Sequence, residues 1–150
     1  VAIGTVADLA PLDRDENRAL VKRGLEVLNR AKRPGVRALL KVAAVEPGTV
    51  SATTIGYAIG PRINAAGRLA NAMIAYELLS AQDEAIAEAR ALELQDLNTQ
   101  RQELTRAAQA TVREQLDLQQ SDGYMIFCFY TKKKFHKNIN TVKIKKNNLF

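Results

Sequence analysis

The chain of 150 residues contains one cysteine, one histidine and no tryptophan. Because Cys128 has no second cysteine to pair with, an intramolecular disulfide is excluded, and a reducing compartment such as the cytoplasm is expected. His136 is the one imidazole that could serve a metal centre. No run of about 18 apolar residues is present, which excludes a transmembrane helix, and no internal repeat is visible.

Charge is distributed unevenly along the chain. Residues 1–120 hold 15 Lys and Arg against 15 Asp and Glu, whereas residues 121–150 hold 7 Lys and 1 Asp. The net charge of +6 therefore comes entirely from the last thirty residues. A basic isoelectric point is not a nucleic-acid-binding signature of the first 120 residues.

The last thirty residues also differ in composition, since they have no Arg and no Ala and are rich in Lys, Asn and aromatic residues. We interpret 121–150 as foreign material from a frameshift, an insertion or a fusion. The alternative is a single-strand-binding tail, because Lys132–Lys134 lie beside Phe135 and near Tyr130. The uncharged stretch 124–130 has high β propensity and predicts a strand.

The stretch Gly60–Arg68 sets two arginines and Asn64 among glycines and alanines. Gly60 and Gly67 allow φ values closed to other residues, so a sharp turn and a close approach to an anion are expected. Arg62 and Arg68 then have the donor geometry that phosphate oxygens prefer. The alternative is a loop between two helices with solvated arginines.

The chain opens with a short, β-branched apolar run, Val1–Val6, which predicts a buried strand. Asp8 follows where the run ends, and a carboxylate there needs a metal, backbone N–H groups or an arginine as partner. Capping of the next turn is the alternative role for Asp8. Asp13 and Glu16 then have the spacing of a helix N-terminus.

These segments, in their order, resemble the RecJ family of single-strand-specific DNA exonucleases, members of the DHH phosphoesterase superfamily. The resemblance covers about residues 1–116. The matching pieces are Gly4–Asp8 with Pro11–Leu12, Asn17–Arg18 with Leu20–Lys22 and Gly24–Leu25, Arg33–Gly35 with Arg37–Leu40, and Gly60–Leu69.

The resemblance implies a hydrolase that removes nucleotides from the 5′ end of single-stranded DNA in DNA repair and recombination. It implies a monomeric, cytoplasmic enzyme with a Mn²⁺ or Mg²⁺ pair, for which Asp8 is a catalytic metal ligand. It also implies that Arg62, Asn64 and Arg68 bind the substrate phosphate.

The family's amino-terminal motifs, including the Asp-His-His triplet, have no counterpart in this chain. Since one carboxylate cannot hold two divalent ions, we expect the chain alone to bind no metal and to be inactive. The chain starts at Val1 without an initiator methionine or a signal peptide, so we interpret it as an internal piece of the enzyme.

Apolar spacing predicts helices over 14–30, 35–44, 53–58 and 70–79. Residues 82–119 have no Gly or Pro and predict one long helix of about 50 Å, too long to be packed along its whole length. A coiled-coil seam is the alternative to a connector for this helix.

The expected fold is mostly α: the C-terminal part of an α/β DHH domain with one remaining strand (1–80), a connector helix (81–120) and the non-family tail (121–150). The function expected is that of a fragment of a RecJ-like exonuclease. The alternatives are a non-catalytic helical fragment that binds nucleic acid or a partner, and a piece of another DHH phosphoesterase.

Overall fold

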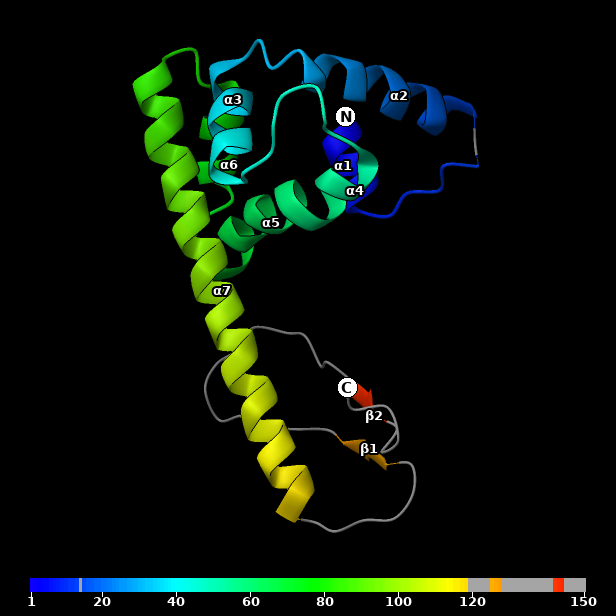
Figure 1. Ribbon diagram of the computed structural model, residues 1–150, viewed down its shortest axis with the longest axis vertical. Helices are drawn as coiled ribbons and strands as arrows, with labels where there is room; N and C mark the ends of the chain where they lie inside the picture. Colours follow the sequence, from blue (N-terminus) through cyan, green and yellow to red (C-terminus); the bar gives the residue numbers. More distant parts are fainter. Residues whose placement is uncertain (14, 119–124, 128–141, 145–150) are drawn as a thin grey trace. The chain divides into compact units, whose positions relative to one another are not determined.

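The computed structural model describes residues 1–13, 15–118, 125–127 and 142–144 (Figure 1). It divides into two compact units, Val1–Ala107 and Ala108–Phe150. All regular structure among the described residues of the first unit is helical. The predicted division at residues 80 and 120 stays a prediction.

The second unit contains an antiparallel pair of short strands, β1 (Met125–Phe127) and β2 (Val142–Ile144). Met125 lies opposite Ile144, and Phe127 lies opposite Val142. The strand predicted over 124–130 is thus confirmed at Met125–Phe127. Cys128, Tyr130, Lys132–Lys134, Phe135 and His136 lie outside the described residues.

The helices follow the sequence expectations in four places. Pro34 begins one of them at its first turn, where its missing N–H costs nothing. Asp83 caps the longest, because its carboxylate accepts a hydrogen bond from the Ile86 N–H at 3.0 Å. These helices are α2 (Asp15–Asn29), α3 (Pro34–Val42), α6 (Met73–Ser80) and α7 (Glu84–Leu118).

The strand expected at the start of the chain is wrong, because these residues form the helix α1 (Ala2–Ala7). Ala2 of this helix is buried. The C-terminal end of α1 forms a Schellman motif, in which Leu9 has a φ of 54°. The Ala10 N–H donates to the Thr5 carbonyl and the Leu9 N–H to the Val6 carbonyl. A short apolar run fits the residue period of a strand as well as that of a helix. Here the backbone N–H and C=O groups bond within the helix, and the helix packs on α2.

The sharp turn expected at Gly60–Arg68 is also wrong. The chain runs as one helical stretch through α4 (Ala52–Thr54), the π-helical turn η1 (Ile55–Ile59) and α5 (Gly60–Leu69). Ser51 and Thr54 form a capping box at its start. Gly60 has a helical φ of −56°. A glycine is therefore not needed there for a left-handed turn, and its lack of a side chain allows close packing instead.

The core of the first unit lies where α3, η1, α5, α6 and the first half of α7 meet. Along α7 the buried positions are Ala87, Ala91, Leu94 and Asn98, which share one helix face. Residues 102–107 are all exposed. The expectation that the long helix is packed over only part of its length is confirmed within this unit. Among the described helices, none is both long and apolar enough to cross a bilayer.

Helices α3 and α6 approach each other closely at Gly35. A Cβ added there would lie 1.8 Å from the Leu78 carbonyl oxygen and 2.8 Å from its carbonyl carbon. Figure 1 shows α3 and α6 beside the first turns of α7. The absence of a side chain at Gly35 is therefore what allows this part of the core to close.

Candidate functional site

Asp8 is the C-cap residue of α1, with a φ of −90° and a ψ of 7°, and it is exposed. Its backbone N–H donates to the Gly4 carbonyl at 2.9 Å. A negative side chain at a helix C-terminus faces the negative end of the helix dipole, which costs about 0.3–1 kcal/mol. The carboxylate thus does not stabilise the helix that it ends.

The end of α1 packs against the start of α5. A Cβ added at Gly60 would lie 3.4 Å from the Ala7 Cβ, one residue before Asp8. Contacts also join α1 to η1. The structure therefore brings together the two segments that sequence analysis selected separately.

The exposed face of α5 carries Asn64, Gly67 and Arg68, which lie three and four residues apart. Ala65 and Ala66, on the other side of the helix, are buried. The amide of Asn64 and the guanidinium of Arg68 are accordingly directed to the same solvent side, next to a position with no side chain. An anion could receive donors from both.

Arg62 is in a different situation, because it is half-buried and its guanidinium is bonded within the protein. Nε donates to Gln95 Oε1 of α7 at 2.8 Å and Nη1 to the Ala58 carbonyl at 2.6 Å. Nη2 donates to the Val42 carbonyl, at the end of α3, at 3.3 Å. Burial lowers the pKa of Arg62 from its usual value, although the group stays charged.

Arg62 thus connects α3, α5 and α7, and sequence analysis missed this role. Its spacing from Arg68 suggests paired ligands for one phosphate, whereas six residues in a helix rotate by about 600°, which points the two side chains about 120° apart. The signal that could have found it is Gln95, a half-buried polar residue on α7 next to the buried Leu94.

Metal binding requires more than Asp8. Within the described part of the chain, no three His, Cys, Asp or Glu side chains lie close enough to hold an ion. Since a two-ion site needs several ligands, these residues do not fit a complete metal centre by themselves.

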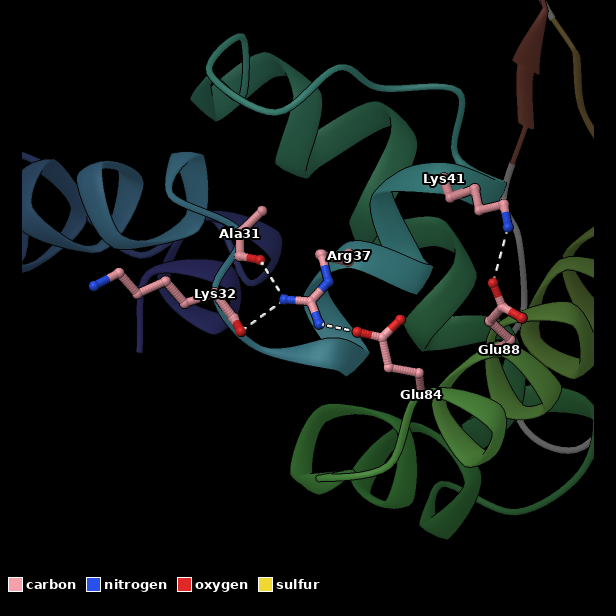
Figure 2. A network of polar contacts seen from close by, with 6 residues as sticks. All are labelled: Ala31, Lys32, Arg37, Lys41, Glu84 and Glu88. Carbon is pink, nitrogen blue, oxygen red and sulfur yellow. Dashed lines mark hydrogen bonds and ion pairs between the residues drawn. The ribbon is translucent and has the colours of Figure 1, made fainter.

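A pocket between α3 and α7 is lined mainly by charged residues. Figure 2 shows the polar contacts that these charged residues make. Arg37 pairs with Glu84 and also donates to the Ala31 and Lys32 carbonyls. Lys41 Nζ lies 2.8 Å from Glu88 Oε1, and this hydrogen bond lowers the pKa of Glu88 and raises that of Lys41. These charges neutralise one another across the two helices, so the pocket fits a structural role.

No family model matches the chain. The single-stranded-DNA-specific exonuclease RecJ of Dickeya dadantii (strain 3937) is 45% identical over 105 residues, which are 69% of this chain and 18% of that protein. The chain thus spans about a fifth of the length of this curated relative.

Structures of RecJ are among the solved structures that are similar to the chain. RecJ from Thermus thermophilus, in complex with Mg²⁺, superposes with a TM-score of 0.68 at 39% identity, covering 81% of this chain and 18% of that one. The exonuclease RecJ bound to manganese superposes with a TM-score of 0.68 at 41% identity, covering 76% of this chain and 29% of that one. Through the part that it has in common with these proteins, the chain belongs to the RecJ family of single-stranded-DNA-specific exonucleases.

Proposed function

We propose that this chain is a piece of a RecJ-like hydrolase that removes nucleotides from the 5′ end of single-stranded DNA, with a role in DNA repair and recombination. The observation that carries the proposal is the packing of the Asp8-bearing end of α1 against α5, which presents Asn64 and Arg68. In this proposal the carboxylate of Asp8 and the donors of Asn64 and Arg68 serve one site, to which two segments about fifty residues apart contribute.

In this proposal Asp8 is one ligand of a Mn²⁺ or Mg²⁺ site that needs further residues from a longer protein. Its unfavourable place at the end of α1 supports a role other than stability. Residues 1–80 form the C-terminal part of the DHH domain, and the long helix connects it to the next part of the enzyme. The relatives with bound Mg²⁺ and manganese support the choice of ion.

The first prediction separates the fragment from the enzyme. The chain purified alone is expected to release no mononucleotides above background from labelled single-stranded DNA with Mn²⁺ present, because one carboxylate cannot hold two ions. A chimaera in which this segment replaces the matching part of a full-length relative is expected to be active. Activity of the isolated chain that survives purification and is lost in Asp8→Ala would contradict the proposal.

The second prediction distinguishes the two arginines of α5. Arg68→Ala in the chimaera is expected to weaken single-strand binding by about 1–3 kcal/mol, because an exposed charge-assisted phosphate contact is lost. The slope of log affinity against log salt should become shallower by about 0.7. Binding isotherms at several salt concentrations measure both quantities.

Arg62→Ala differs from Arg68→Ala because it is expected to lower the unfolding temperature of the chimaera. The substitution removes three hydrogen bonds within the protein. Arg30→Ala, which replaces an exposed arginine just after α2, is the matched control for loss of charge. If Arg68→Ala bound like the parent chimaera with an unchanged salt slope, the phosphate role of Arg68 would be wrong.

A further inference from the structure

Tyr57 is a tyrosine that the described structure leaves almost bare, with 84% of its surface exposed. It lies in the π-helical turn η1, and such turns are frequent at functional sites. Its neighbours Ile55 and Ile59 are fully buried, which fixes the turn on the core. The burial of these two neighbours fixes the backbone of the turn, and the Tyr57 ring is exposed to solvent.

Tyr57 lies in the same continuous helical stretch as the exposed face of α5. The exposed positions of residues 55–69 are Gly56, Tyr57, Asn64, Gly67 and Arg68, which we name the tyrosine strip. Tyr57 precedes Arg68 by eleven residues, which correspond to about 16 Å along a helix. Gly56 is next to Tyr57 and Gly67 is next to Arg68, so a ligand can approach the backbone beside each of these two side chains.

Charge around the tyrosine strip favours an anionic ligand. Residues 47–76 contain two arginines and no Asp or Glu, whereas residues 1–120 as a whole contain 15 acidic residues. Of the two arginines, Arg62 is occupied by internal partners and Arg68 is exposed. An exposed aromatic ring on the same helical stretch as an arginine without an acidic partner among the described residues is a combination with which proteins hold the base and the phosphate of a single strand.

We propose that Tyr57 stacks on a nucleobase of the single strand whose phosphate contacts Arg68, and that it positions the strand along the tyrosine strip. This inference rests on the proposed function, because it assumes that the strand lies on α5. It adds a contact that reads the presence of a base, which phosphate contacts do not.

The test compares two ligands on the 150-residue chain, using fluorescence anisotropy at fixed salt. One is a labelled thymidine oligonucleotide and the other is an abasic sugar-phosphate strand of equal length. Tyr57→Leu is expected to lose about five-fold or more in affinity for the oligonucleotide and nothing for the abasic strand, since stacking needs a base. Tyr57→Phe is expected to bind both like the unchanged chain.

Tyr76→Leu is the matched control, because Tyr76 is also an exposed tyrosine, at 64%, but lies on α6. Arg68→Ala is expected to weaken both ligands equally, so failure of the phosphate site has a different signature from failure of stacking. Circular dichroism verifies that each variant keeps its helical content.

A second measurement needs no variant. A single strand with 5-iodouracil is expected to cross-link on irradiation to the tryptic peptide of residues 42–62, whose one aromatic residue is Tyr57. The proposal is overturned if Tyr57→Leu binds the oligonucleotide as tightly as the unchanged chain, or if the cross-link falls outside that peptide. It is also overturned if Tyr76→Leu reproduces the loss.

Discussion

Asp8→Ala, in a chimaera that carries this segment in a full-length relative, is expected to lower the rate of nucleotide release by orders of magnitude. The physical reason is the loss of a proposed metal ligand, whereas most of the affinity for DNA comes from phosphate contacts elsewhere. Single-turnover rates measure the first effect, and binding without turnover measures the second. Affinity is expected to stay close to that of the parent chimaera.

Asp96→Ala is the control, since Asp96 is an exposed aspartate on α7. Thermal unfolding of Asp96→Ala should match the parent chimaera, and Asp8→Ala should be as stable or slightly more stable, because neither side chain is buried and Asp8 opposes the dipole of α1. A rate for Asp8→Ala within a few-fold of the parent would reduce Asp8 to a residue that merely ends α1.

Gly35→Ala in the 150-residue chain is expected to lower the free energy of unfolding by at least about 3 kcal/mol. The new methyl group would meet the Leu78 carbonyl, which belongs to a packed helix backbone and cannot rotate away as a side chain would. Urea unfolding followed by circular dichroism measures the loss. The expected result is a lower midpoint, or a chain that does not fold at all.

Gly4→Ala is the matched control for this substitution. Gly4 is also a glycine within a helix, but a Cβ built there has no neighbour within 4 Å among the described atoms. Alanine should therefore stabilise α1 by about 0.5–1 kcal/mol through its higher helix propensity. Equal effects of the two substitutions would show that the α3–α6 approach is looser than described.

The long elements could be predicted from the sequence because their signals are local. Pro34 fixes the start of α3, and the absence of Gly and Pro from residues 82–119 predicts α7 almost to its ends. The incomplete packing of α7 followed from its length alone. Such features depend on residues that are close in the chain.

Two expectations failed because their outcome depends on residues far apart. The Val1–Val6 run suits a strand only if other strands accept it, and in the first unit it packs on α2 as a helix instead. Gly60 suggests a turn when considered alone, whereas the Ala7 side chain that it accommodates lies fifty-three residues earlier. The internal partners of Arg62 come from α3 and α7 for the same reason.

Arg62 also has a mechanical consequence. Because one guanidinium bonds to the Ala58 carbonyl just before α5, to the end of α3 and to Gln95 of α7, a rotation of α7 about its axis would strain bonds at all three places. The half of α7 that ends near Asn98 is therefore expected to move together with α5 as one rigid body. Bending is expected in residues 102–106, whose side chains are all exposed.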